Sequence, residues 1–136
     1  FAKTFQFVNA IEIDKERAEY LKNNINVYDL DNVKVYNDDC INILGHLDNH
    51  HVIMCDPIWG KDYKDHIKLQ LHISGHSIED LCIDLFTSKS IKKNPNIIIL
   101  KLPVNYDIAH LYKKLKHHTI YLYDLKKMFI IVLVRK

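Results

Sequence analysis

One stretch of the chain combines side chains suited to holding a flat, hydrogen-bonding group: "VIMCDPIWGKDYK", residues 52–64. An apolar run ends there at Asp56 and Pro57, and the chain's only tryptophan, Trp59, follows just before Gly60. Proline fixes φ, so this turn would hold the Asp56 carboxylate and its neighbouring carbonyl groups rigidly. A carboxylate accepts hydrogen bonds from an amine, and an indole stacks on a planar cation. The alternative interpretation is a turn whose tryptophan packs in the core.

Acidic residues also end two earlier apolar runs. Glu12 and Asp14 follow "FVNAI", and Asp38 and Asp39 follow "VKVYN". Ligands of open α/β sheets bind outside the carboxyl ends of the strands, where an acid can accept the hydroxyls of a ribose. Any one of these acids could instead cap a following helix. Because three successive strand ends carry carboxylates and the third also carries Trp59, the pattern favours a binding site.

The elements that must position these residues alternate between strands and helices. Strands are expected at 7–14, 32–39, 50–56, 96–103, 119–125 and 128–136. Helices are expected at 15–29, 77–89 and 107–118, and a short helix or turn at 40–47. Asp14 suits the N-cap of the first helix, and Ser77 with Asp80 forms a capping box. The alternation predicts a doubly wound α/β fold with a mostly parallel sheet, a C-terminal antiparallel hairpin and one antiparallel strand at an edge.

Composition limits the class of protein. With 136 residues and 48% hydrophobic content, the chain predicts one folded domain over residues 1–136, and its net charge of +2 permits an anionic partner. Its three cysteines, Cys40, Cys55 and Cys82, lack paired spacing and indicate reduced thiols in an intracellular protein. No apolar run reaches the ~18 residues of a membrane span. None of the nine histidines has an acid or cysteine at ligand spacing, so no metal is expected.

Three motifs together resemble a known family. "NAIEID", "VYNDD" and "DPIWG" are similar to the class I S-adenosylmethionine-dependent methyltransferases that modify exocyclic amines. "DPIWGKDY" most resembles the trimethylguanosine synthases, which methylate the 2-amino group of the 7-methylguanosine cap of RNA. The resemblance covers residues 1 to about 110. It implies a Rossmann-like methyltransferase fold and capped RNA as partner. The reduced thiols predict a location in the nucleus or cytoplasm, and the many Asn, Lys and Ile residues suggest an AT-rich genome, such as that of a parasite or a large virus.

The resemblance implies roles for the acidic strand ends and for the Asp-Pro pair. Asp56 and Pro57 match the catalytic pair that holds the target amine. Glu12 matches the ribose-binding acid of the S-adenosyl-L-methionine site, and Asp39 matches the acid that faces the adenine amine. Asp14 and Asp56 complete the expected cofactor-binding set.

Substrate binding is expected immediately after the Asp-Pro pair. Trp59 resembles the ring that stacks on the methylated guanine, and Lys61, Tyr63 and Lys64 adjoin it. A 7-methylguanine carries a positive charge, and indole is the best ring for a cation–π contact. The methyl donor is already activated, so the protein's task is to align the amine with it and to exclude water.

The chain departs from the family pattern at three points. Ile58 stands where the family has a second proline, and a single glycine follows Trp59 where the family usually has two. No glycine precedes Gly45, although the family carries a glycine-rich methionine-binding loop before its acidic strand. The sequence therefore predicts an N-terminally truncated domain that lacks the first strand and this loop.

Two other functions fit the same residues. One is an amino-methyltransferase that acts on adenine or cytosine, or on a protein amide. The other is a non-catalytic nucleic-acid- or partner-binding domain that has lost the cofactor site.

Overall fold

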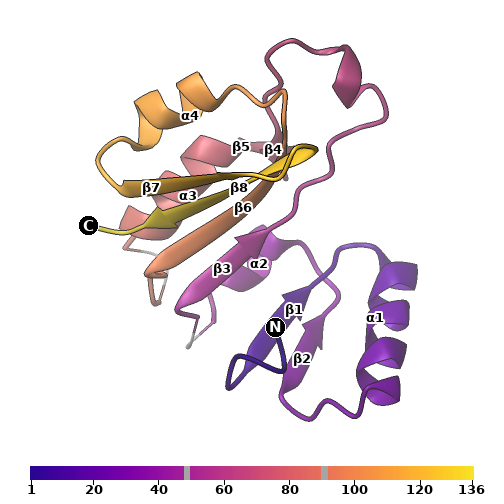
Figure 1. The fold of residues 1–136 in the computed structure, drawn as a ribbon. Coiled ribbons are helices and arrows are strands. Elements are labelled where there is room, and N and C mark those ends of the chain that lie inside the picture. The colour runs from indigo at the N-terminus through magenta and orange to yellow at the C-terminus, as the bar shows by residue number, and fades with distance from the viewer. Residues whose placement is uncertain (48–49, 90–91) are drawn as a thin grey trace. The chain divides into compact units, whose positions relative to one another are not determined.

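The structure is a computed structural model, and it describes residues 1–47, 50–89 and 92–136 (Figure 1). The chain divides into two compact units, Phe1–Asp48 and Asn49–Lys136. Within the described part of the chain, no helix is long and apolar enough to cross a bilayer.

The first unit is a two-stranded parallel sheet with two helices. Its elements are β1 (Val8–Ile11), α1 (Lys15–Val27), β2 (Val33–Tyr36) and α2 (Cys40–Leu44). β1 and β2 run in register from Val8 opposite Val33 to Ile11 opposite Tyr36. Because the strands are parallel, the residues that follow them lie at the same edge of the sheet. The acids expected to bind a cofactor follow these two strand ends.

The second unit contains the remaining strands and helices. In chain order these are β3 (Val52–Cys55), a 3₁₀ turn (Tyr63–Asp65), β4 (His72–Ile73), β5 (His76–Ser77), α3 (Ile78–Thr87), β6 (Ile97–Pro103), α4 (Ile108–Leu115), β7 (Thr119–Asp124) and β8 (Met128–Val134). Four strands form a sheet in the order β3-β6-β8-β7, and β4 pairs with β5 separately. β3 and β6 are parallel, whereas β8 is antiparallel to both of its neighbours. The predicted α/β class with a C-terminal antiparallel hairpin is confirmed.

The expected position of the antiparallel strand is wrong. β8 lies between β6 and β7, and β7 is the edge strand. The physical reason is the difference in hydrophobicity between the two hairpin strands. β8 buries Ile131 and Leu133 completely against its neighbours, whereas Tyr121 and Tyr123 of β7 remain more than half exposed. The more apolar strand therefore takes the interior position, where both of its edges are paired.

Two helix N-termini form as the sequence predicts. The Asp14 carboxylate accepts a hydrogen bond from the Arg17 amide at 2.9 Å at the start of α1. The Ser77 hydroxyl accepts from the Asp80 amide at 3.1 Å and donates to the Asp80 carboxylate at 2.8 Å at the start of α3. An N-cap of this kind contributes about 1 kcal/mol of stability.

Strand β6 presents one apolar face to the core of the second unit. Ile98, Leu100 and Leu102 are fully buried, and Ile98 and Leu100 lie opposite the buried Leu133 and Ile131 of β8. Successive side chains of a strand point to opposite faces of the sheet. Lys101, between Leu100 and Leu102, therefore leaves the sheet on the face opposite to this core.

A buried polar pair joins α3 to the segment that follows β6. The Tyr106 hydroxyl donates a hydrogen bond to the Glu79 carboxylate at 2.7 Å, and the two residues are only 4% and 1% exposed. Burial and the adjacent carboxylate raise the pKa of the Tyr106 phenol far above its ordinary value, so the tyrosine is the proton donor of this pair.

Candidate active site

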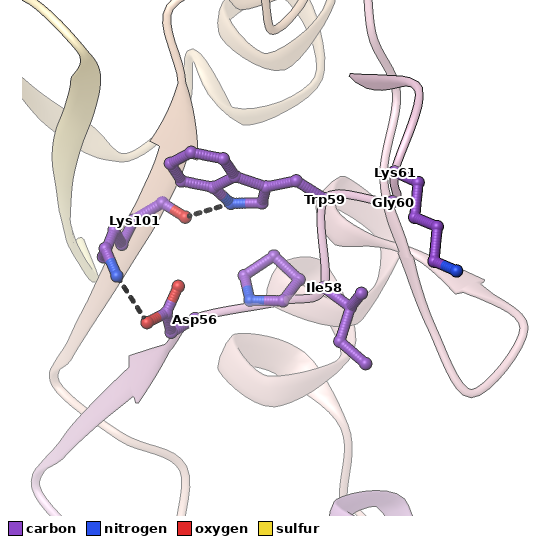
Figure 2. Close-up of a pocket in the computed structure, with 7 residues that line it drawn as sticks. Asp56, Ile58, Trp59, Gly60, Lys61 and Lys101 are labelled. Carbon is purple, nitrogen blue, oxygen red and sulfur yellow. Dashed lines mark hydrogen bonds and ion pairs between the residues drawn. The ribbon is translucent and has the colours of Figure 1, made fainter. Parts of the chain in front are cut away.

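An open pocket of about 440 Å³ lies at the carboxyl end of β3 (Figure 2). Its lining consists of six consecutive residues and one residue of β6: Asp56, Pro57, Ile58, Trp59, Gly60, Lys61 and Lys101. The structure thus brings the predicted catalytic pair and the predicted stacking ring to one pocket. Lys101 also lines the pocket, and the sequence did not predict this.

The strand register explains why Lys101 reaches the Asp-Pro turn. Cys55 of β3 pairs with Leu100 of β6, so Asp56 and Lys101 are the next residues along neighbouring parallel strands. The Lys101 ammonium lies 2.7 Å from Oδ2 of Asp56. The lysine side chain is 32% exposed and the aspartate side chain is 50% exposed, so the pair is only partly withdrawn from water.

Trp59 is held on two sides. Its indole Nε1 donates a hydrogen bond to the Lys101 carbonyl oxygen at 3.4 Å (Figure 2). The Tyr63 ring contacts the indole edge to face, with 5.2 Å between the centroids and 66° between the planes. The Lys101 ammonium lies 5.9 Å from the indole centroid. Lys101 therefore contacts both Asp56 and Trp59, the two side chains for which the sequence predicts chemistry.

The turn after Trp59 depends on Gly60. Its φ is +84°, a backbone conformation that side chains with a Cβ adopt only with strain. Apart from its two chain neighbours, no atom of the described residues lies within 4 Å of the place where a Cβ would be, so backbone conformation is the constraint at Gly60 and crowding is not. The single glycine is sufficient to turn the chain here, where the resembling family usually has two.

Asn105 positions the segment that contains Tyr63. Its side-chain amide donates to the carbonyl oxygens of Tyr63 at 2.6 Å and His66 at 2.7 Å. The backbone adds two bonds, since the Leu69 amide donates to the Asn105 carbonyl and the Asp107 amide donates to the Leu69 carbonyl, both at 2.9 Å. The loop after β6 thus holds the residue that supports the indole.

The three residues predicted to bind substrate beside Trp59 differ in where they lie. Tyr63 contacts the indole directly. Lys61 lines the pocket, but its side chain extends away from Asp56 and Trp59 (Figure 2). The Lys64 ammonium lies 5.8 Å from the Tyr63 ring centroid. Their roles in binding stay predictions.

The acids predicted to bind the cofactor follow β1 and β2 in the first unit. Glu12 is half-buried, and its carboxylate accepts from the Asp14 amide at 2.9 Å. Asp39 caps α2 by accepting from the Ile41 amide at 3.0 Å. Asp14 caps α1. Helix capping, the alternative interpretation, therefore describes Asp14 and Asp39 correctly.

The hydrogen bonds described above take up only part of the acceptor capacity of these carboxylates. A carboxylate has about four acceptor sites, and each of those bonds uses one. Glu12 and Asp39 lie at the same edge of the parallel β1–β2 pair, and the Glu12 amide donates to the Tyr36 carbonyl at 3.0 Å across it. These acceptors suit the hydroxyls of a ribose and the amine of an adenine, so the residues fit the nucleoside part of S-adenosylmethionine.

The residues that the structure describes include no group of three or more His, Cys, Asp or Glu side chains that could hold a metal ion.

Two solved structures with a similar fold are methyltransferases. The precorrin-6y C5,15-methyltransferase of Geobacter metallireducens GS-15 superposes with a TM-score of 0.64 at 11% identity, covering 96% of this chain and 68% of that one. An rRNA methylase from Streptococcus thermophilus superposes with a TM-score of 0.62 at 12% identity, covering 98% of this chain and 76% of that one. The fold is thus that of the Rossmann-like class I methyltransferases.

The family follows from the sequence match. Residues 1–130 match the RNA cap guanine-N2 methyltransferases, and the chain belongs to that family. A relative in Acanthamoeba polyphaga mimivirus, the uncharacterized protein L320, is 42% identical over 136 residues. The match covers 97% of this chain and 51% of the relative, so the chain spans about half the length of that protein.

Proposed function

We propose that this chain carries the methyl-acceptor site of an S-adenosylmethionine-dependent enzyme that methylates the exocyclic 2-amino group of the 7-methylguanosine cap of RNA. The observation that carries the proposal is the pocket in which the Asp56 carboxylate and the Trp59 indole both lie against Lys101. A hydrogen-bond acceptor beside a stacking ring is what a flat base with an exocyclic amine requires. Membership of the cap guanine-N2 methyltransferase family supports this choice of substrate.

Asp56 and Pro57 would act on the amine. The lone pair of an exocyclic guanine nitrogen is delocalised into the ring, which makes the amine a poor nucleophile. Hydrogen bonds from the amine to the Asp56 carboxylate and the Pro57 carbonyl favour a nitrogen whose lone pair is free and directed out of the ring plane. When bound, the cofactor supplies an activated methyl group, so orientation is the main contribution that the protein makes.

Trp59 would select the capped base. A cation stacked on a desolvated indole gains about 2 kcal/mol, and 7-methylguanine is cationic whereas guanine is neutral. The contacts of Trp59 with Tyr63 and with the Lys101 carbonyl hold the ring in place before the base arrives. Such preorganisation reduces the entropy that is lost on binding.

Glu12 and Asp39 would hold the nucleoside of S-adenosylmethionine. A thermal shift with S-adenosylhomocysteine tests this role, because a ligand that binds only the native state raises the melting temperature. Glu12→Ala should abolish the shift. Glu19→Ala is the matched control, since Glu19 is an exposed glutamate of α1 that pairs with Lys22.

Titration with 7-methyl-GTP tests the acceptor site. Trp59→Ala should weaken binding about 30-fold, which corresponds to the loss of about 2 kcal/mol of cation–π energy. Tyr112→Ala is the matched control, because Tyr112 is an aromatic residue of α4 that is 60% exposed and lies outside the pocket lining. Equal affinity of the wild type and Trp59→Ala for 7-methyl-GTP would contradict the proposed function.

A second candidate is methylation of an uncharged acceptor, such as an amine of adenine or cytosine or a protein amide. The positive charge of Lys101 inside the pocket favours it, because a cationic base would approach that charge. A panel of capped RNA, uncapped RNA, DNA and peptide acceptors with labelled cofactor separates the two candidates.

A further inference from the structure

The pocket already contains a cation. The Lys101 ammonium lies 2.7 Å from the Asp56 carboxylate and 5.9 Å from the centroid of the Trp59 indole. In the proposed function, these same two groups receive the guanine of the cap. Lys101 and the positively charged 7-methylguanine would therefore interact with the same acceptor, Asp56, and the same ring, Trp59.

Electrostatics makes this overlap selective. The lysine compensates the charge of Asp56, so a second cation in the pocket gains less from the carboxylate and is repelled by the ammonium. Unmethylated guanine carries no charge and is not repelled in this way. Lys101 thus opposes the preference for a cationic base that Trp59 provides.

The fold keeps Lys101 at this position. Its backbone lies within β6, where it pairs with Ile130 of β8, and its carbonyl accepts the hydrogen bond from Trp59. The side chain is 32% exposed, and alternation along the strand directs it away from the core face formed by Leu100 and Leu102. Among the residues that line the pocket, Lys101 is the one contributed from outside the Asp56–Lys61 turn.

We propose that Lys101 is a specificity-determining residue that limits how strongly the site prefers 7-methylguanine over guanine. This inference rests on the proposed function and adds a regulator of selectivity to it. Trp59 raises affinity for the cationic base, and Lys101 lowers it, so the observed preference is the difference between two opposed effects.

Lys101→Met is the direct test. Methionine is of similar length and uncharged, and the backbone carbonyl that binds Trp59 is present whatever the side chain. Because Trp59 is the chain's only tryptophan, its intrinsic fluorescence reports ligand binding at this site and at no other indole. The probes are 7-methyl-GTP and GTP, measured below neutral pH, where the methylated base is cationic.

The measured quantity is the ratio of the two dissociation constants. Both probes carry the same triphosphate, so any contact of Lys101 with phosphate cancels in that ratio. We expect Lys101→Met to raise the preference for 7-methyl-GTP about tenfold, an effect typical of one partly screened charge. Lys101→Arg should leave the ratio unchanged.

Lys114→Met is the matched control. Lys114 also pairs with an aspartate, Asp80, at 3.2 Å and is also partly exposed, but it does not line the pocket. Its replacement removes the same charge from the protein and should not alter the ratio. Lower ionic strength should raise the preference of Lys101→Met more than that of the wild type, because Lys101 compensates the Asp56 carboxylate only in the wild type and salt screens the attraction of that carboxylate for the cationic base.

The outcomes separate the two proposals. If the wild type binds 7-methyl-GTP through Trp59 and Lys101→Met gives the same ratio as the wild type, the inference about Lys101 is wrong and the proposed function stands. If the wild type binds neither nucleotide, the proposed function is wrong and the inference falls with it.

Discussion

The Lys101 ammonium and the Asp56 carboxylate are 2.7 Å apart, although 45 residues separate them in the chain. The pairing of β3 with β6 makes this contact. Cys55 of β3 lies opposite Leu100 of β6, so the next residues, Asp56 and Lys101, are neighbours. It joins the residue expected to hold the target amine to a residue expected to influence which base enters.

Asp56 should recognise the 2-amino group itself. A hydrogen bond to a charged acceptor is worth about 1.5–3 kcal/mol, so the wild type should bind 7-methyl-GTP at least about tenfold more tightly than 7-methyl-ITP, which lacks that amine. Asp56→Ala should lose most of this preference, with the Pro57 carbonyl as the remaining acceptor. Asp56→Asn should keep a larger part of it because its amide oxygen still accepts. Fluorescence titration of Trp59 measures all six dissociation constants. An undiminished preference in Asp56→Ala would remove this role.

Asn105 should position the substrate platform. Asn105→Ala deletes the hydrogen bonds to Tyr63 and His66 and should lower the free energy of unfolding by about 1–3 kcal/mol. It should also weaken 7-methyl-GTP binding, because Tyr63 supports the indole.

The chain offers a close control for that variant. The side-chain amide of Asn94 also donates to two backbone carbonyls, those of Leu85 and Ser88, at 2.9 and 3.1 Å. Asn94→Ala should cost similar stability in urea denaturation but leave nucleotide affinity unchanged. Equal binding losses in both variants would mean that Asn105 acts only through global stability.

The Tyr106–Glu79 pair should be a stability element. Tyr106→Phe leaves the nearly inaccessible Glu79 carboxyl group without this donor, which should cost about 1–3 kcal/mol. Thermal unfolding should therefore shift down by several degrees. Tyr123→Phe removes a hydroxyl from an exposed residue of β7 and should leave the melting temperature unchanged. Equal melting temperatures for Tyr106→Phe and the wild type would contradict the prediction.

His118 should make stability depend on pH. Burial, followed by the charges of His117, Lys136 and Arg135, lowers the pKa of the His118 imidazole below 6.5. The folded state therefore favours the neutral ring, which lies 4.5 Å from the Phe86 ring. This contribution is complete above pH 6.5 and is lost as the pH falls through the lowered folded-state value.

The comparison with a non-titrating variant measures that effect. His118→Phe keeps an aromatic ring beside Phe86, and its unfolding free energy relative to the wild type should increase steadily as the pH falls from neutral into the acidic range. Urea denaturation at several pH values gives this difference. Parallel curves for the two proteins would show that His118 does not contribute.

Local features of the fold were predictable from the sequence. The caps at Asp14 and Ser77 involve partners three residues away, so residue type and spacing are sufficient to identify them. The turn at Asp56 and Pro57 was also accessible, because an apolar run ends there at a proline. The position of β8 was not, since strand order depends on which hairpin strand gains more from burial.

The support of the site was not predictable for a similar reason. Lys101 and Asn105 act on residues about forty positions earlier in the chain, at separations of 42 to 45 for Trp59, Tyr63 and Asp56. One signal was present, because Lys101 is the only charged residue in the apolar strand "IIILKLP". A lysine in such a strand either reaches solvent or has an acidic partner, and the sequence does not name the partner.

These separations bear on the order of events during synthesis. Trp59 leaves the ribosome 42 residues before the carbonyl of Lys101, to which its indole is bonded in the folded protein. Until β6 has emerged and paired with β3, the Asp-Pro-Ile-Trp-Gly peptide is a motif without a pocket, and its indole has no fixed orientation. A nascent chain arrested before residue 97 should therefore contain every residue of that motif and yet show the fluorescence of a solvent-exposed tryptophan.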